Sequence, residues 1–469
     1  MSVPLSLDDQ GFSRLVSPRV AQVRLGEIST ALATIRDQFV SENAAGLSVL
    51  EQNLRAWTTL HTRNDLTERS LQVAERVRAG FEVFVHVGIG GSDLGPRVCH
   101  EVLDHTLYNE LSAERRGAPR LYFTGDTFDP RPLRELLGML EAQGALGRTA
   151  FNIVSKSGKT PETVCTLLAI KDRLGENWTK QVVFTTGERP GDSILFDLAA
   201  DKREEFLGIL PVPEGVGGRF SEPSPVGLLP LAVATDSNLQ TPQERVEQAM
   251  AGYARAHELG LLDPEDPQNL AFRLARWLHL AEEQLGVGSL VLYDYSGCRM
   301  LGDWLVQLYT ESIQERGGGL NVIASRGPTS NHSLLNGIIS GPRDKAILFL
   351  RWGDLGEDLD VPTDTSLGGG VDIFMGRSMA ALQEASLQGT VSDLARNGVP
   401  AMVLTVPARD TYHLFLLLRL LMDMVAVKGR LQQLHLAADG QINFPGELTY
   451  LQAGVEGYKH AMRDCLKNL

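Results

Sequence analysis

The segment SKSGKTPET, residues 155–163, gathers hydroxyl groups, two cations and a glycine within a short span. Thr160 can cap a helix that starts at Pro161, because proline is favoured at the first helical position. The free N–H groups of such a first turn, with hydroxyls on either side, form a cradle for one phosphate monoester. A capped helix with solvated lysines is the alternative, and the density of donors favours the anion site. The cradle consists of Ser155, Lys156, Ser157, Gly158, Lys159 and Thr160.

Gly158, Lys159 and Thr160 also match the end of a nucleotide-binding P-loop. That loop requires a glycine five residues before Gly158, because this residue starts the backbone turn around the β-phosphate. Ile153 occupies the position, inside an apolar run. The spacing therefore excludes an ATP-binding P-loop and leaves another phosphate as the expected ligand.

A second glycine-rich loop, GIGGSDLGP, covers residues 88–96. Its glycines let the backbone approach a ligand closely, and Ser92 is placed to cap the helix that follows. A dinucleotide-binding fingerprint needs a small residue at position 93, where Asp93 would repel a pyrophosphate. Taken alone, the loop fits a ligand contact through Gly91 and Ser92 as well as it fits a plain strand–helix turn.

Short apolar strands alternate with helical patterns along most of the chain, and they divide into two sets. The first set covers residues 81–87, 120–125, 151–155 and 181–186, and the second covers 289–296, 320–325, 346–352 and 401–406. Nearly continuous apolar strands separated by helices indicate parallel sheets covered on both faces. Ligands of such sheets lie beyond the carboxyl ends of the strands, where both glycine-containing loops are found.

A helical stretch from about 241 to 286 separates the two sets of strands and implies two α/β domains. We predict a helical segment over residues 1–78 that packs on the second domain, α/β domains over 79–240 and 241–438, and a C-terminal arm over 439–469. The expected fold class is therefore α/β, with two αβα sandwiches built on parallel sheets.

The chain of 469 residues carries a net charge of −14, and 43% of its residues are hydrophobic. These values are typical of a soluble globular protein and disfavour a surface for nucleic acid or anionic membranes. The most apolar run, 413–427, is interrupted by Arg419 and Asp423 and is too short to span a bilayer. Four scattered cysteines without metal-binding spacing indicate a reducing compartment. The start of the chain has no export signal, so we expect a cytoplasmic protein. Because the cysteines lack metal-binding spacing, we expect no metal.

Five motifs occur in order from about residue 80 to the end of the chain. They are GIGGSDLGP (88–96), SKSGKTPET (155–163), GGRFSEPSP (217–225), QLYTES (307–312) and QAGVEGYK (452–459). Together they resemble the glucose-6-phosphate isomerase family. The resemblance implies two sugar-isomerase (SIS) type αβα sandwich domains, a homodimer with shared active sites, and no metal or organic cofactor. It also implies that the phosphate in the cradle belongs to a sugar 6-phosphate.

The family's reaction opens a hemiacetal ring, moves a proton between C2 and C1, and stabilises an enediolate. This chemistry requires a base near the carbons, acid–base groups at the ring oxygen, and a cation near the developing negative charge. By resemblance Glu311 is the base and Gln307 contacts the substrate. Without the resemblance, the polar stripe that carries both residues is more often a solvated helix face.

His332 and Lys459 are implied at the ring oxygen, Arg219 at the enediolate, and Gln452 at the phosphate. Each has a plainer interpretation, because loop side chains are usually solvated and a lysine near a helix C-terminus is favoured by the helix dipole. The chain departs from the family's pattern at Leu451, where aspartate is usual, and at Lys159, where an uncharged residue is common. These departures affect local hydrogen bonds and phosphate affinity and remove no group that does chemistry.

Three functions from different classes remain on sequence grounds. The first is an isomerase that interconverts glucose 6-phosphate and fructose 6-phosphate through a cis-enediol. The second is a catalytically silent sugar-phosphate sensor, which would usually lack the base and carry a DNA-binding module. Glu311, His332 and Lys459 are all present and no basic helix-turn-helix segment is evident, so this function ranks lower. The third, a nucleotide-dependent kinase or dehydrogenase, fails on the spacing of both loops.

Overall fold

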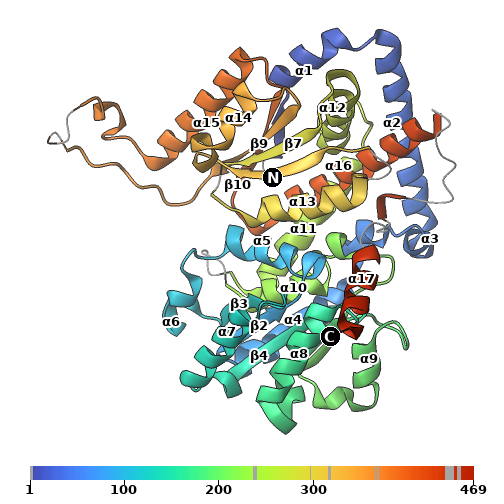
Figure 1. Cartoon of the computed structure of the whole chain (residues 1–469), viewed down its shortest axis with the longest axis vertical. Coiled ribbons are helices and arrows are strands. Elements are labelled where there is room, and N and C mark those ends of the chain that lie inside the picture. Colours follow the sequence, from blue (N-terminus) through green and yellow to red (C-terminus); the bar gives the residue numbers. More distant parts are fainter. Residues whose placement is uncertain are drawn as a thin grey trace.

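The computed structural model describes residues 4–235, 240–295, 297–314, 318–364, 366, 369–438, 448–450 and 456–468. They form two α/β lobes, each built around one five-stranded sheet (Figure 1). Strands within both sheets are mainly parallel. The predicted α/β class with parallel sheets is therefore confirmed.

The lower sheet in Figure 1 has the strand order β3-β2-β4-β5-β6, and all neighbours run parallel. Its strands are β2 (Val83–Val87), β3 (Arg120–Thr124), β4 (Thr149–Ser155), β5 (Val182–Thr186) and β6 (Gly208–Pro211). The first four coincide with predicted strands apart from their ends. The sequence did not predict β6, because GILP is short, begins with glycine and ends with proline, and so carries no strand pattern.

The upper sheet has the order β1-β10-β9-β7-β8. Its strands are β1 (Ser6–Asp8), β7 (Ser289–Asp294), β8 (Asn321–Arg326), β9 (Lys345–Asp354) and β10 (Ala401–Ala408). Only β1 is antiparallel, with Leu7 opposite Leu404 of β10. The segment that we predicted to be helical thus contains a strand near its start. Three residues are too few to show the alternation of apolar and polar side chains that predicts a strand.

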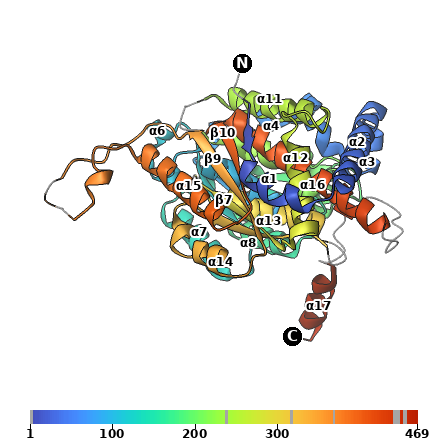
Figure 2. The same ribbon diagram turned by 90° about the horizontal axis from the view of Figure 1, so that it is seen from above.

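Helices pack around both sheets (Figures 1 and 2). They are α1 (Gln10–Val16), α2 (Gln22–Ala45), α3 (Leu47–Gln52), α4 (Asn64–Gly80), α5 (Leu94–Leu103), α6 (Ala113–Arg116), α7 (Pro130–Ala142), α8 (Pro161–Leu174), α9 (Ile194–Ala199), α10 (Pro225–Val233), α11 (Pro242–Gly260), α12 (Leu270–Leu285), α13 (Met300–Ile313), α14 (Leu334–Ser340), α15 (Met379–Arg396), α16 (Thr411–Ala438) and α17 (Glu456–Lys467). The N-terminal helices are shared between the lobes: α1 and α2 contact α12 and α16, whereas α4 contacts α10 and β6.

Apart from β1, the two sheets have the same topology. In each, the chain passes from the first strand to a neighbour on one side and then crosses to the other side of the first strand. The reversal creates a crevice between β2 and β4, and another between β7 and β9, where α/β proteins bind their ligands. The helices that follow the two first strands, α5 and α13, pack against each other across the joint between the lobes.

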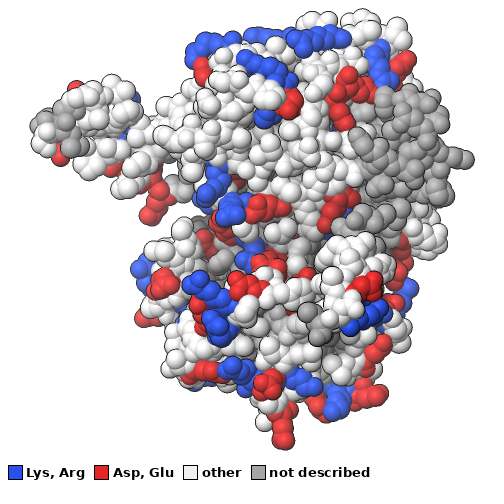
Figure 3. Space-filling model, viewed as in Figure 1, with Lys and Arg blue, Asp and Glu red and all other residues white. Residues whose placement is uncertain are grey.

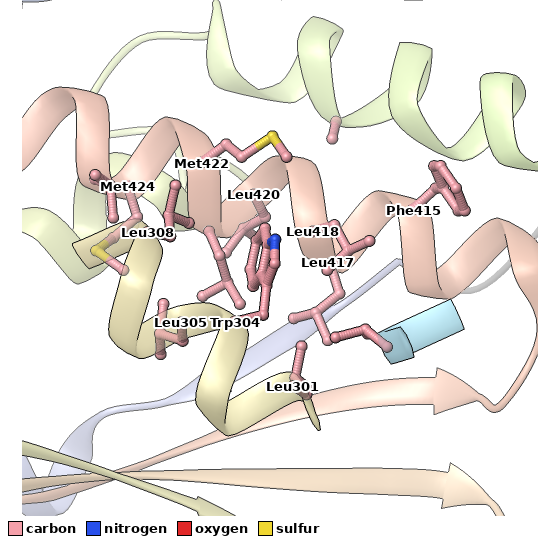
Figure 4. Packing of buried hydrophobic residues seen from close by; sticks show 14 of the residues in the cluster. Leu301, Trp304, Leu305, Leu308, Phe415, Leu417, Leu418, Leu420, Met422 and Met424 are labelled. Carbon is pink, nitrogen blue, oxygen red and sulfur yellow. The ribbon is translucent and has the colours of Figure 1, made fainter. Parts of the chain in front are cut away.

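One face of α13 is buried against α16 and fixes the rotation of the helix (Figure 4). The buried side chains are Leu301, Trp304, Leu305 and Leu308. Burying each such side chain contributes roughly 1.5–3 kcal/mol. With 3.6 residues per turn, this face turns Gln307 and Glu311 to the adjacent side of the helix, where both are half-buried.

In the part of the chain that the structure describes, no helix is long and apolar enough to cross a membrane. On the face drawn in Figure 3, acidic and basic side chains are interspersed over the lower lobe, and Lys and Arg side chains gather along the upper edge. Interspersed charges of both signs are typical of a surface that faces water.

Candidate active site

The two glycine-containing loops of the lower lobe lie side by side. β2 and β4 are parallel neighbours, with Val87 opposite Ile153. The loops that follow them, residues 88–93 and 156–160, therefore leave the same edge of the sheet at its switch point. This is the crevice in which the topology favours a ligand.

Buried His86 of β2 holds the first loop in place. Its Nε2–H donates to the carbonyl of Ser92 (2.7 Å), and its Nδ1 accepts from the side-chain amide of Asn152 (3.3 Å). Burial lowers the pKa of His86 to about 4, so the ring is neutral near pH 7 and can act as donor and acceptor at once. The carbonyl of Ser92 is thereby tied to the sheet.

Asp93, and not Ser92, stands at the N-cap position of α5, which corrects the prediction for that helix. Ser92 instead ends a short 3-10 turn, η3 (Gly90–Ser92). The carboxylate of Asp93 caps no N–H of α5. Its Oδ2 instead accepts from Arg97 Nε–H (2.5 Å). Burial raises the pKa of Asp93 to about 7, against the opposing effect of Arg97. The side chain that would repel a pyrophosphate is thus directed into the protein.

The loop of residues 88–93 also crosses a further glycine-containing segment, η8 (Gly218–Phe220), with backbone packed against backbone. A Cβ atom on Gly91 would lie 2.2 Å from the carbonyl carbon of Gly218, so a side chain at Gly91 cannot fit. Ser221 Oγ lies within hydrogen-bonding distance of the carbonyls of Gly218 (2.7 Å) and Gly91 (3.2 Å) and so bridges the crossing. Gly91, which sequence analysis could not distinguish from part of a plain turn, is therefore required by this close approach.

Arg219 emerges from the crossing and is almost completely buried. Its Nη1–H donates to Glu311 Oε2 (3.2 Å), its Nε–H to Ser312 Oγ (2.7 Å), and its Nη2–H to the carbonyl of Thr449 (2.7 Å). Burial lowers the pKa of Arg219, an effect that the Glu311 carboxylate opposes. A guanidinium remains charged in proteins, so Arg219 is a fixed cation beside the carboxylate.

Glu311 lies near the C-terminal end of α13 with both carboxylate oxygens hydrogen-bonded. Oε2 accepts from Arg219, and Oε1 accepts from Gln307 Nε2–H (3.2 Å). Its side chain is 24% exposed, so the carboxylate is held in position and remains accessible. Gln307 Oε1 is buried without a hydrogen-bond partner among the described atoms, and a Cβ on Gly90 would lie 2.9 Å from Gln307 Nε2. A hydroxyl donor, such as that of a bound ligand, would satisfy this oxygen.

An aromatic stack lies behind Arg219, and the sequence analysis did not identify it. Phe220 stacks on Trp57 with ring centroids 4.7 Å apart, and Tyr450 packs against Phe220 edge-on at 5.3 Å. Tyr450 belongs to η11 (Leu448–Tyr450), which also supplies the Thr449 carbonyl that Arg219 contacts. The C-terminal segment is thus anchored at the site just before the QAGVEGYK motif.

The cradle after β4 is preorganised by its own hydroxyls. Ser155 Oγ lies 3.0 Å from Thr160 Oγ1 and accepts from Gly158 N–H (3.1 Å), and Ser157 Oγ accepts from Lys159 N–H (3.2 Å). Gly158 has φ +64°, a left-handed conformation that favours glycine. The loop is therefore a rigid turn with its hydroxyl groups gathered at the start of α8.

Thr160 occupies the N-cap position of α8 and Pro161 the first helical position, as predicted. The Thr160 hydroxyl nevertheless makes no capping hydrogen bond, because it pairs with Ser155 instead. Among the described atoms, Thr163 Oγ1 in the first turn of α8 is also buried without a partner. The helix N-terminus thus retains donors that a bound anion can use.

The two lysines of the cradle differ in their surroundings. Lys156 Nζ donates to the carbonyl of Val216 (3.0 Å), and loss of hydration lowers the pKa of this ammonium group. Val216 directly precedes the Gly217-Gly218-Arg219 turn, so Lys156 connects the cradle to the loop that carries Arg219. Both lysines nevertheless remain exposed to solvent.

Other site residues predicted from the sequence lie elsewhere. His332 ends an exposed 3-10 turn, η9 (Thr329–His332), after the edge strand β8. The side chain of its neighbour Asn331 accepts from the hydroxyl of Tyr293 and donates to the hydroxyl of Tyr295. Lys459 is on α17, which projects from the body of the protein (Figure 2). Gln452 and Leu451 lie outside the described residues.

Glu222, one turn beyond Arg219, is a buried acid that the sequence analysis did not single out. Its Oε1 accepts from the thiol of Cys99 (3.0 Å), and its Oε2 has no partner among the described atoms. Cβ atoms on Gly95 or Gly227 would lie 2.0 and 2.2 Å from the carboxyl oxygens, so the two glycines leave the space that the carboxyl group occupies. Burial raises the pKa of Glu222 to about 8.

The contribution of Glu222 to the stability of the protein should fall as the pH rises from about 5 to about 8. Glu222 stays protonated when folded and ionises in the unfolded chain, so the unfolded state binds fewer protons in this interval and stability falls. At about 1.4 kcal/mol per pKa unit, the loss reaches at most a few kcal/mol. Urea unfolding at pH 5 and pH 8.5 measures it. The stability of Glu222→Gln relative to wild type should rise between the two pH values, whereas the same pH dependence in both proteins would contradict the role of Glu222.

Comparison with known proteins shows which family this chain resembles. The family model of phosphoglucose isomerase matches residues 60–249. The glucose-6-phosphate isomerase of Rubrobacter xylanophilus is 35% identical over 405 residues, which cover 85% of this chain and 88% of the relative. That of Carboxydothermus hydrogenoformans is 29% identical over 97% of each chain.

Solved structures share the fold. A hypothetical protein from Thermus thermophilus superposes with a TM-score of 0.79 at 28% identity, over 98% of this chain and 99% of the other. A glucose-6-phosphate isomerase from Chlamydia trachomatis gives a TM-score of 0.66 at 21% identity, over 85% of this chain and 73% of the other, and so supports the fold alone. With 35% identity to a relative across most of both chains, this protein belongs to the phosphoglucose isomerase family.

Proposed function

We propose that the protein interconverts glucose 6-phosphate and fructose 6-phosphate by ring opening and proton transfer through a cis-enediol. The observation that carries this proposal is the Arg219–Glu311 pair, a buried cation held 3.2 Å from an accessible carboxylate beside the glycine loop. Isomerisation of an aldose to a ketose needs such a base next to a cation that stabilises the enediolate. The names of the relatives support the same reaction.

In the proposed reaction, His332 and Lys459 act at the ring oxygen to open the hemiacetal. Glu311 then removes the proton from C2 of the open aldose, and the electron pair forms the C1–C2 double bond of the enediolate. Arg219 stabilises the negative charge on the oxygen, and Glu311 returns the proton to C1 while the proton of the C2 hydroxyl passes to the C1 oxygen. The C2 oxygen becomes the ketone, and no co-reactant is needed.

The remaining groups orient the substrate. Gln307, with its orphaned Oε1, contacts a sugar hydroxyl, and Gly91 and Ser92 line the same side through their backbone. The cradle from Ser155 to Thr160 binds the 6-phosphate, and Gln452 adds a contact from the C-terminal segment. Lys156, tied to Val216, keeps the phosphate site and Arg219 at a constant separation. None of these roles requires a metal or organic cofactor.

The phosphate should dominate substrate recognition. Charge-assisted hydrogen bonds to phosphate are about twice as strong as neutral ones, and losing several of them costs several kcal/mol. We therefore expect free fructose to be isomerised with a kcat/KM at least about a thousandfold below that of fructose 6-phosphate. Coupled detection of glucose 6-phosphate, or of glucose from the free sugar, measures both without added metal or nucleotide.

A phosphorylated aldonate that mimics the enediolate serves as the second probe and should inhibit competitively. Its unphosphorylated counterpart is the matched control and should be a poor inhibitor. Comparable turnover of the free and phosphorylated sugars would refute the phosphate-binding role of the cradle, whereas no turnover of fructose 6-phosphate at all would refute the isomerase itself.

We also propose that the protein works as a homodimer in the cytoplasm, with His332 acting in the site of the partner subunit. His332 is exposed in a turn that follows β8, an edge strand of the upper sheet, and no hydrogen bond of the described residues joins it to the Arg219–Glu311 pair. A segment after β9 projects from the upper lobe (Figure 1) and exposes Leu359, Ile373 and Phe374 by 65%, 64% and 47%. Apolar side chains on a projecting segment are expected to be covered by a second copy of the chain.

A further inference from the structure

The helix that carries Glu311 begins without a cap of its own. Arg299 is the N-cap residue of α13, and its side chain caps no N–H. The cap comes from Glu101 of α5, whose Oε2 accepts from the N–H groups of Arg299 (2.7 Å) and Met300 (2.6 Å). The first N–H groups of a helix have no partner within the helix, and a carboxylate there also complements the helix dipole.

Further contacts hold the C-terminal end of α5, which carries Glu101, in place. Arg409, which follows β10, donates through Nε–H to the carbonyl of Val102 near the C-terminal end of α5 (2.9 Å), and its Nη2 lies 2.9 Å from Cys298 Sγ. Asp104, the C-cap residue of α5, pairs with buried Arg245 of α11 (2.9 Å). The end of α5 that presents Glu101 is therefore held from both sides.

The other end of α5 lies at the proposed active site. The η3 turn comes just before α5, and its Gly90 lies against Gln307 in the second half of α13. One end of α5 thus contacts the start of α13 and the other end contacts the region of Glu311, so the two helices run antiparallel. At 1.5 Å per residue, α5 is about 15 Å long and the path from Met300 to Glu311 is about 16 Å.

We propose that Glu101 is a positioning residue that sets where α13 lies along α5, and thereby where Glu311 lies relative to the glycine loop and Arg219. This inference rests on the proposed isomerase function. Catalysis is sensitive to such placement, because a shift of about 1 Å can cost about a hundredfold in rate. The 6-phosphate cradle lies between β4 and α8, apart from α13. Because the phosphate should dominate recognition, substrate binding should change less than turnover even though Gln307 is on α13.

Substitutions that alter the length and charge of residue 101 separately test the inference. Glu101→Gln keeps an acceptor oxygen at the same reach and should retain at least about a third of the wild-type kcat. Glu101→Asp keeps the charge but withdraws it by one methylene, and should lose about tenfold. Glu101→Ala should lose between about tenfold and a hundredfold, on the scale of a misplaced base. In all three, KM for fructose 6-phosphate should stay within about twofold of wild type.

Glu244→Ala is the matched control. Glu244 accepts from the N–H and the hydroxyl of Thr241 (both 2.8 Å) in a capping box at the start of α11, far from Glu311 in the chain. It should lower the melting temperature about as much as Glu101→Ala and leave kcat unchanged. If the Glu101 variants lose stability but keep kcat within twofold, or lose kcat only in proportion to stability, the positioning role is refuted.

Amide hydrogen exchange distinguishes this inference from the isomerase assignment. Peptides that begin at residue 299 and cover α13 should exchange faster in Glu101→Ala than in Glu244→Ala, whether or not the enzyme is active. An inactive wild-type protein would refute the proposed function, whereas an active wild type with unchanged exchange and unchanged kcat in Glu101→Ala would refute only the role of Glu101. If Glu101→Ala does not fold, the Asp and Gln variants decide by the order of their kcat values.

Discussion

Glu311→Gln should reduce isomerisation by about a thousandfold or more, because it removes the base and leaves the surroundings in place. A positioned general base contributes typically about 10²- to 10⁴-fold, and its orientation adds to this. The amide keeps an acceptor for Gln307 Nε2–H, and Arg219 keeps Ser312 and the Thr449 carbonyl. The fold and the cation should therefore persist. Measurement of kcat with fructose 6-phosphate, and in the reverse direction with glucose 6-phosphate, tests the loss.

Anomerisation of the sugar provides the internal control for Glu311→Gln. Ring opening is assigned to His332 and Lys459, so enzyme-accelerated anomerisation should survive in this variant. Asp303→Asn is the matched substitution, because Asp303 lies two turns earlier on the same polar stripe and contacts Arg299 (3.5 Å). It should keep nearly normal activity. Near-normal exchange of the C2 proton with solvent in Glu311→Gln would show that another residue is the base.

Two inactive variants should restore each other's activity when mixed. Glu311→Gln and His332→Ala homodimers should each be nearly inactive, because each lacks one group in both sites. If every site takes Glu311 from one chain and His332 from the other, a heterodimer contains one intact site and one site with both defects. Random pairing makes about half of the dimers heterodimers, so recovered activity should approach about a quarter of wild type. Refolding equal amounts together and measuring kcat tests this.

The mixing experiment also has a decisive negative outcome. If His332 acted within its own chain, every site in the heterodimer would keep one defect and mixing would restore nothing. Native mass spectrometry establishes whether heterodimers have formed, and mixing each variant with itself gives the background. Confirmed heterodimers without activity would refute the shared site and leave the isomerase assignment intact.

Local patterns in the sequence were sufficient for much of the fold. Apolar runs at regular intervals identified the main strands of both sheets, because a strand buried on both faces has to be apolar throughout. The absence of a glycine at Ile153 excluded a P-loop, and the sequence order of strands and loops placed both glycine-containing loops at one edge of a sheet. Motif order indicated the family. These features depend on residues close together in the chain.

Short strands and helix caps were harder to predict from the sequence. β1 and β6 exist as strands because they pair with β10 and β5, and their own residues carry no periodic signal. Thr160 was expected to cap α8 with its hydroxyl, but the competing bond to Ser155 prevails once the loop turns at Gly158. Ser92 lost its predicted cap position because the η3 turn moves the start of α5 by one residue.

The arrangement of the site was decided only by the tertiary structure. Arg219 meets Glu311 across 92 residues and the Thr449 carbonyl across 230, and Glu101 caps a helix that begins 199 residues later. A one-dimensional pattern reports which face of a helix or strand is buried, but not which distant group lies against the other face. Sequence alone therefore identified Glu311 and Arg219 as candidates, and it is the packing of α5, α13 and the crossing of two glycine loops that brings the base and the cation together.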